Sequence, residues 1–482
     1  MSYSLCSDIL ESKNKVQTQS IGIQCDLDPD HFYYEARCST PIQKPQKVEE
    51  QKREEEGGGE EDGGFDEPTK QKEVDKQKTT KIATVDLHWF KQDCNQIIVT
   101  ELAIIDQFNN YIVFHFKSPF AKTELSAKLY NDVTWLERYY KKMTSLKNKY
   151  PELSVTLAIG GWNEGSASYS AMAANPTKRK LFVESVVIML SKHGFDGLDL
   201  DWEYPAKRGG SPEDKANFVS LIKDLRAEMD KKGWILTAAI GAGKDTIERA
   251  YDLPQISTYL DYIHLMTYDY HGSWDQKVGA NAPLSTAEPN DELTVEYSIN
   301  YLLSNGVAPE KLVMGIPAYG RTFILKNPES KEAKLGDSTQ ETGFGGPYTK
   351  EKGFMGYNEI CAELAKDSTW QEWWDNTTKT QFARNGEKVI SFDNEISIGE
   401  KVKFAMRNKL AGMMVWSVDT DDFRGECHQQ EPFTILRVIE KSMATSLQEI
   451  EKHKKPNAAV QSISVSLALL FCMLHVLLYC NH

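Results

Sequence analysis

Short runs of β-forming residues alternate with amphipathic helical segments between Leu153 and Ser417, and this alternation limits the fold more than any other feature. The run LSVTLAI (153–159) is apolar on both faces, as a parallel strand buried between two layers would be. Asn175-Pro176 predicts the start of a helix, and Gly194 predicts its end. Such a chain forms a parallel sheet, either open and doubly wound or closed into a barrel.

The residues that follow the predicted strands decide between these two sheets. Polar and aromatic residues stand there in five groups: Gly160-Gly161-Trp162, Asp201-Trp202-Glu203, Tyr268-Asp269, Tyr319-Gly320-Arg321 and Trp416. Residues from many strands that meet at one rim are typical of a barrel, whereas an open sheet concentrates its site at one switch point. No GxGxxG follows a strand and no Walker-type GKS or GKT occurs, so no nucleotide-binding motif is visible. We therefore predict an α/β fold, a (β/α)8 barrel.

One predicted strand is rich in acids. The segment GFDGLDLDWEYP (194–205) carries four carboxylates: Asp196, Asp199, Asp201 and Glu203. Alternate residues of a strand share a face, so the last three acids point into the barrel, and Leu198, Leu200 and Trp202 point towards the helices. Neighbouring carboxylates in a low-dielectric interior repel, so at least one should keep its proton near neutral pH. A calcium loop fits poorly, because bulky apolar residues separate the acids. The arrangement favours catalysis, with Asp196 as a structural hydrogen-bonding residue.

A proton donor at the end of this strand suits cleavage of a glycosidic bond, in which an acid protonates the leaving oxygen. The acids have the spacing DxxDxDxE, and four other segments accompany them: AIGGWN (158–163), MTYDYHG (266–272), GIPAYGR (315–321) and MVWSVDTDDFRG (414–425). Over about residues 102–440 the chain resembles glycoside hydrolase family 18, and it looks most like the secreted chitinases of animals. The resemblance implies a retaining mechanism in which the substrate's acetamido group replaces an enzyme nucleophile.

The resemblance also implies roles for the residues at the rim. Glu203 would be the general acid and then the base for the incoming water. Asp201 would hold the 2-acetamido group while its oxygen attacks C1, and Asp199 would share a proton with Asp201. Tyr268 would hydrogen-bond the acetamido oxygen, and Asp269 would support the sugar or the acid.

Aromatic and polar neighbours complete the implied site. Trp416 would form the floor under the sugar at the cleaved bond, because sugar C–H faces pack well on indole. Further candidate substrate contacts are Trp162, Met266, Tyr319 and Arg321, although Trp162 and Met266 are equally well explained as core residues. We expect no cofactor and no metal, since the ten histidines form no cluster with ligand spacing. His264 is expected to face the helices as a core residue.

A segment between Arg321 and Ser391 is too long for an ordinary barrel loop. In the resembling family an α+β insertion between strands seven and eight occupies this place, so we expect one over residues 322–391. The resemblance further implies a disulfide between Cys361 and Cys427. Asn376-Thr377-Thr378 is a glycosylation sequon within the insertion. These features indicate an oxidising, secretory compartment, with the protein outside the cell or on its surface.

The start of the barrel departs from the family pattern. Closure needs eight strands, and we count seven, beginning with IIVTELAII (97–105). The β-like run KIATVD (81–86) leaves no room for a crossover helix before it. Cys94 lacks its usual partner unless Cys25 supplies one. We therefore expect a degenerate or missing first strand within a domain over residues 81–440. Such a chain should fold poorly or be weakly active, because unpaired strand edges would lie beside the rim.

The two ends of the chain differ from its middle. Residues 1–80 are polar and acidic, so we expect disorder there, and no signal peptide is visible. After a charged linker (441–457), the apolar tail (458–482) predicts the addition signal for a lipid anchor, or alternatively a single membrane span. The formal net charge of −14 argues against nucleic-acid binding.

Two functions of different classes follow. An endo-chitinase would hydrolyse β-1,4 linkages in N-acetylglucosamine polymers. A chitinase-like lectin or growth-factor-type protein would bind chito-oligosaccharides without cutting them. Relatives of the second kind usually have the last acid of the motif replaced, so Glu203 favours the enzyme. We expect the protein to be a monomer. The unusual ends alone would suggest a third class, an intracellular or tail-anchored scaffold.

Overall fold

The computed structural model describes residues 101–105, 110–116, 140–151, 153–329, 334–427 and 431–454. The predictions for residues 1–80, for KIATVD, for Cys25 and Cys94 and for the apolar tail at 458–482 lie outside these ranges. Within them, no helix is long and apolar enough to cross a lipid bilayer.

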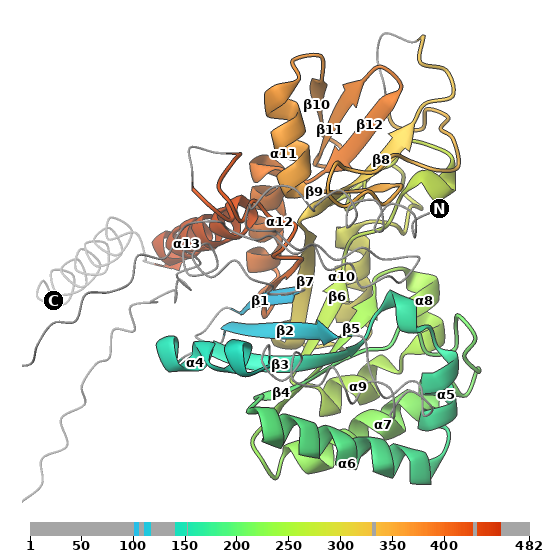
Figure 1. Ribbon diagram of the computed structural model, residues 1–482, viewed down its shortest axis with the longest axis vertical. Coiled ribbons are helices and arrows are strands. Elements are labelled where there is room, and N and C mark those ends of the chain that lie inside the picture. The colour runs from blue at the N-terminus through green and yellow to red at the C-terminus, as the bar shows by residue number, and fades with distance from the viewer. Residues whose placement is uncertain are drawn as a thin grey trace, which may run out of the picture.

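Eight strands close into a barrel, in the order β1-β13-β7-β6-β5-β4-β3-β2 (Figure 1). Their bounds are β1 (Glu101–Ile105), β2 (Asn110–Phe116), β3 (Leu153–Gly160), β4 (Gly197–Asp201), β5 (Ile235–Gly241), β6 (Tyr262–Met266), β7 (Leu312–Pro317) and β13 (Gly412–Trp416). All neighbours from β2 round to β13 are parallel, as the alternation of strands and helices predicts.

The count of seven strands is wrong, because NYIVFHF (Asn110–Phe116) forms the strand β2, which the count omitted. β2 runs parallel to β3, with Asn110 opposite Leu153. Only residues 106–109 separate it from β1, too few for a crossover helix, so β1 pairs antiparallel with β2. β1 also pairs antiparallel with β13. The first strand is therefore present but runs antiparallel to both of its neighbours, and both of its edges are paired.

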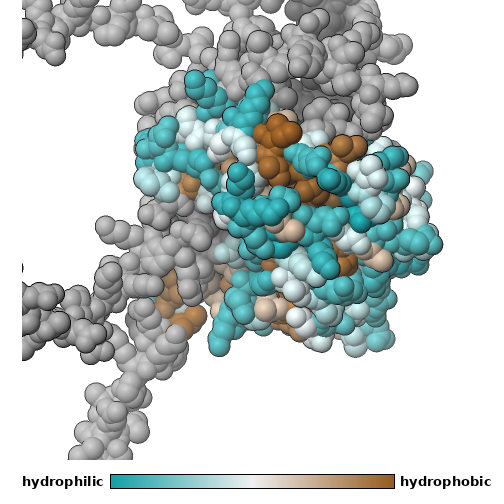
Figure 2. All heavy atoms as spheres, turned by 90° about the horizontal axis from the view of Figure 1, so that it is seen from below, coloured by the Kyte–Doolittle hydropathy of each residue, from teal (hydrophilic) through white to brown (hydrophobic). Residues whose placement is uncertain are grey.

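Helices pack against the outside of the barrel and against the inserted sheet. Their bounds are α4 (Leu146–Lys149), α5 (Ala167–Ala173), α6 (Pro176–His193), α7 (Asp214–Met229), α8 (Lys244–Ala250), α9 (Leu253–Tyr259), α10 (Val295–Ser304), α11 (Tyr357–Lys366), α12 (Glu395–Arg407) and α13 (Thr434–Lys454). The predicted signals bound α6: the Asn175 side chain accepts from the backbone N–H groups of Thr177 and Lys178, and Gly194 ends the helix at φ 75°. On the side of α6, seen in Figure 2, hydrophobic residues form separate patches on a largely hydrophilic face.

The predicted insertion between barrel strands seven and eight is a five-stranded antiparallel sheet, in the order β10-β11-β12-β8-β9. Its strands are β8 (Tyr319–Ile324), β9 (Phe354–Gly356), β10 (Gln371–Asp375), β11 (Thr380–Asn385) and β12 (Lys388–Phe392). Only Ala318 separates β7 from β8, so the sheet grows directly out of the barrel rim. At Gly320 a Cβ atom would lie 2.8 Å from Ile360 of α11, which shows how closely α11 packs on this sheet.

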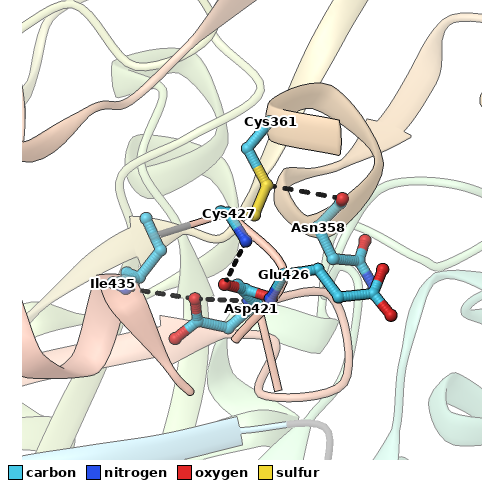
Figure 3. The surroundings of a disulfide bond; sticks show 7 residues. Asn358, Cys361, Asp421, Glu426, Cys427 and Ile435 are labelled. Carbon is cyan, nitrogen blue, oxygen red and sulfur yellow. Dashed lines mark hydrogen bonds between the residues drawn. A yellow bond between two sulfur atoms is a disulfide. The ribbon is translucent and has the colours of Figure 1, made fainter. Parts of the chain in front are cut away.

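The disulfide implied by the resemblance is present. Cys361 of α11 is bonded to Cys427, in the segment after β13 (Figure 3). The same segment is fixed to the start of α13, because Asp421 accepts from the backbone N–H groups of Ile435 and Leu436, at 3.0 and 3.2 Å. The insertion, the end of the barrel and the last helix are thus joined at one point.

Candidate active site

The acids of β4 lie on the predicted face. Asp199 is fully buried, Asp201 is 2% exposed and Glu203, two residues beyond the strand, is 8% exposed. The alternate residue Trp202 packs in the outer layer between Tyr169 and Phe218, with ring centroids 5.8 and 5.9 Å away. β4 therefore presents its carboxylates to the barrel interior and its apolar side chains to the helices.

Asp196 makes the structural hydrogen bonds expected of it. Its side chain accepts from the backbone N–H of Val155 at 2.8 Å and from Lys147 Nζ at 2.7 Å. These bonds join the start of β4 to β3 and to α4, away from the other three acids of the motif.

Asp199 lies in a fully buried polar group with Thr237 of β5 and His264 of β6. His264 Nδ1 is 3.0 Å from Asp199 Oδ1, and Thr237 Oγ1 donates a hydrogen bond to the same oxygen. The prediction that His264 faces the helices is wrong. Ile263 and Leu265 occupy the outer core, so alternation along β6 turns His264 inwards.

A close approach of two strands fixes the backbone at Asp201. The N–H of Gly161 donates to the carbonyl oxygen of Asp201 at 2.8 Å. Gly160 has φ 127°, and a Cβ atom there would lie 1.9 Å from that oxygen. Only glycine fits at this point. The end of β3 thus holds the segment between Asp201 and Glu203 in place.

Glu203 is bound on two sides. Tyr204 hydrogen-bonds its carboxyl group, and burial together with the charge of Glu203 raises the pKa of Tyr204 well above its ordinary value. The phenol therefore stays protonated. On the backbone side, Arg208 Nη1 donates to the carbonyl oxygen of Glu203 at 3.0 Å and to that of Trp162 at 2.7 Å.

Asp269 connects the barrel to the insertion. Its Oδ1 accepts from Tyr319 Oη and from Arg321 Nε, both at 2.7 Å, and its backbone N–H donates to Asn281 Oδ1 at 3.0 Å. Burial alone would lower the pKa of Arg321, but the charge of Asp269 raises it overall. Burial and the same charge raise the pKa of Tyr319. Sequence patterns gave no sign of Asn281, which also donates to the carbonyl oxygen of Tyr319.

The aromatic candidates divide into packed and exposed residues. Tyr268 is 9% exposed and meets Tyr319 edge-on at 6.0 Å, and Met266 and Trp416 pack half-buried against the same cluster. Trp162, by contrast, is 55% exposed and so is not a core residue.

Trp274 is a second exposed indole that the sequence analysis missed. It is 51% exposed, and the guanidinium of Arg321 lies 5.1 Å from its ring. It lies two residues after MTYDYHG (266–272), but an exposed tryptophan in a loop has no periodic pattern that would distinguish it.

The remaining sequence candidates lie away from this rim. Asn376 is exposed in the turn between β10 and β11, where glycosylation remains a prediction. Among the described residues, no three His, Cys, Asp or Glu side chains are grouped so that they could hold a metal ion.

Comparison with known proteins decides the family. Residues 74–421 match the family described as glycosyl hydrolases family 18. The chain belongs to this family. It is 53% identical over 300 residues to probable chitinase 2 of Drosophila melanogaster, and the alignment covers 61% of each chain. It is 37% identical to an endochitinase of Manduca sexta, over 57% of that protein.

Two solved structures with similar folds bear on the question of activity. The chain is similar to a group IV chitinase of Ostrinia furnacalis in complex with allosamidin, with 39% identity, a TM-score of 0.65 and coverage of 70% of this chain and 91% of that one. It is also similar to human YKL-39, described as a pseudo-chitinase that retains chitooligosaccharide binding, with 30% identity, a TM-score of 0.60 and coverage of 69% and 91%. The fold is therefore shared with one protein described as a chitinase and with one described as a pseudo-chitinase.

Proposed function

We propose that this chain is an endo-chitinase that cleaves β-1,4 linkages between N-acetylglucosamine units with retention of configuration. The observation that carries the proposal is the intact row of Asp199, Asp201 and Glu203 on the inner face at the end of β4. A proton donor at the rim, backed by two buried carboxylates, is what a substrate-assisted glycosidase needs.

Glu203 acts first as the acid. Its carboxyl group protonates the glycosidic oxygen while the acetamido oxygen of the sugar attacks C1, so the leaving group departs and an oxazolinium ion forms. Glu203 then removes a proton from the incoming water, which restores its carboxylic acid. The water oxygen attacks C1 and displaces the acetamido oxygen, so the oxazolinium ring opens. Its place just beyond the end of β4, with Tyr204 hydrogen-bonded to its carboxyl group, supports this role.

Asp201 holds and polarises the acetamido group during this attack. Asp199 shares a proton with Asp201, and its Oδ1 contacts with Thr237 and His264 hold its carboxyl group in place. Tyr268 donates a hydrogen bond to the acetamido oxygen. Its burial against Tyr319 supports this role, because a packed ring holds its hydroxyl in one direction.

The sugar chain lies along the rim. Trp416 and Met266 form the floor of the central subsite, and the Asp269–Arg321–Tyr319 group supplies polar contacts beside it. Trp162 and Trp274 are exposed indoles at other points of the rim, suited to further sugar units.

The named relatives support this reaction, since two of them are called chitinases and one chitinase binds allosamidin. The alternative is a protein that binds chito-oligosaccharides without cutting them, as human YKL-39 is described. We further propose that the protein acts outside the cell, which the Cys361–Cys427 disulfide supports.

Replacement of Glu203 by Gln tests the proposal. The variant keeps the shape of the side chain but has no transferable proton, so kcat should fall by about 10²–10⁴-fold while chito-oligosaccharide binding persists. Release of a fluorophore from a chitotrioside measures turnover, and calorimetry measures binding. Absence of turnover in the unmodified chain, with binding intact, would favour the sugar-binding alternative.

A further inference from the structure

We propose that Arg208 is a positioning residue that fixes the indole of Trp162 as a one-sided platform for sugar. The inference rests on the proposed function, because it assumes that a sugar chain lies along the rim. It concerns the affinity for a long sugar chain and makes no claim about proton transfer by Glu203.

Arg208 makes three contacts at once. Its guanidinium carbon lies 3.5 Å from the centroid of the Trp162 ring, well within the range of a cation–π contact. Its Nη1 donates to the carbonyl oxygens of Trp162 and Glu203. One planar group therefore covers one face of the indole and ties its backbone to the segment that carries the proposed acid.

Trp162 needs such a support, because the core does not hold it. It belongs to a short 3-10 helix, Trp162–Glu164, and more than half of its surface is exposed. A free indole would lose rotamer freedom when a sugar binds, and that loss weakens binding. The stacked guanidinium removes this freedom beforehand and leaves the opposite face of the ring for the C–H groups of a pyranose.

The loop that presents Arg208 is held in an uncommon backbone conformation. Arg208 has φ 50°, and Ala206 has φ 61°, both in the left-handed region that non-glycine residues rarely adopt. Gly209 follows at φ 90°. Such a conformation persists where the surroundings enforce it.

Buried polar groups enforce this conformation. Asp214, which is fully buried, accepts from the backbone N–H groups of Ala206 and Ser211. Ser166, 1% exposed, donates its backbone N–H to the carbonyl oxygen of Arg208 and its hydroxyl to that of Tyr204. The loop is thus fixed from inside the protein, and the Arg208 side chain is directed at Trp162.

Lys207 provides a matched control. It is the adjacent cation of the same loop, but its Nζ binds Asp245 and Thr246 instead of Trp162. Arg208→Gln and Lys207→Gln each remove one positive charge, so a general electrostatic effect on the substrate would be the same in both.

The test measures the dissociation constant of chitohexaose by calorimetry in the Glu203→Gln background, where the ligand is not cut. Arg208→Gln should weaken binding about two- to fivefold, the size of an exposed cation–π contact, and Lys207→Gln should leave it unchanged. In a Trp162→Ala background, Arg208→Gln should have no further effect. Arg208→Lys should resemble Arg208→Gln, because an ammonium group cannot stack and bridge as the planar guanidinium does.

Two results would overturn the inference: equal effects of Arg208→Gln and Lys207→Gln, or a full effect of Arg208→Gln without Trp162. If thermal unfolding shows that Arg208→Gln is misfolded, Arg208→Lys is compared in its place.

Failure of the proposed function would give a different result. If the unmodified chain binds chitohexaose but does not cleave it, only the chitinase proposal is rejected. Lack of hexaose binding by the unmodified chain would overturn both.

Discussion

At the scale of single residues, the acids of β4 differ in what surrounds them, and the surroundings predict different effects of mutation. Asp201 lies beside Glu203 with its backbone fixed by Gly161, whereas Asp196 binds Val155 and Lys147 at the opposite end of the strand. The first placement suits the proposed chemistry, and the second suits a role in folding.

We predict that Asp201→Asn lowers kcat by about 10²–10³-fold with little change in melting temperature, because it removes a group that acts on the transition state. Asp196→Asn should do the reverse, lowering stability by about 1–3 kcal/mol and leaving kcat close to normal. Chitotrioside hydrolysis and thermal unfolding of the two variants measure these effects. Equal loss of activity in both would contradict the separation of roles.

Several residues of the site lay beyond sequence reasoning for definite physical reasons. Trp274 and Arg208 are exposed loop residues whose partners become neighbours only when the barrel closes, so periodicity carries no information about them. His264 is different. The alternation of β6 was enough to turn it towards Asp199, and the general tendency of a lone histidine to be a core residue outweighed that pattern.

At the scale of elements, sequence patterns predicted the parallel strands and the caps of α6 but omitted β2. The reason is topological. Parallel strands require a crossover between them, so a second strand four residues after β1 did not fit the expected barrel. The structure needs no crossover there, because β1 runs antiparallel to β2. The barrel is closed, so the reason for expecting poor folding no longer applies.

The disulfide between α11 and the segment after β13 leads to a prediction about stability. Cys361 and Cys427 close a loop with a sequence separation of 66. Replacing both by alanine should lower the free energy of unfolding by about 2–4 kcal/mol, mainly through the unfolded chain. Denaturant unfolding with and without reductant measures this. The double variant should not respond to the reductant, and a response would show that other cysteines contribute.

The cap of α13 predicts a pH dependence. Burial raises the pKa of Asp421 to about 7, although the backbone N–H groups of Ile435, Leu436 and Asp422 act in the opposite direction. The native state thus retains a proton that the unfolded state loses near pH 4, so the contribution to stability is fully present at low pH and is lost as pH rises towards 7. Asp421→Asn, which cannot ionise, should lack this part of the pH dependence in unfolding measured from pH 4 to 8. Identical slopes for both proteins would argue against the assignment.

At the scale of the whole molecule, the apolar tail at 458–482 predicts surface attachment. Cells that express the chain should release it when treated with a phospholipase specific for phosphatidylinositol, because that enzyme cuts a glycolipid anchor. Retention after effective treatment would indicate a membrane span instead, and recovery in the untreated medium would indicate that nothing anchors the protein.

The pairing of β1 with β13 also determines when the barrel can close during synthesis. Glu101 lies opposite Trp416, so the last gap in the barrel cannot close until more than 300 further residues have been made. At about 5–20 residues per second, the ribosome needs roughly 15–60 seconds for that stretch. Through this interval the outer edge of β1 has no native partner, and such an edge readily pairs with other chains. We therefore expect the protein to depend on chaperones during its synthesis more than a domain built from local contacts would.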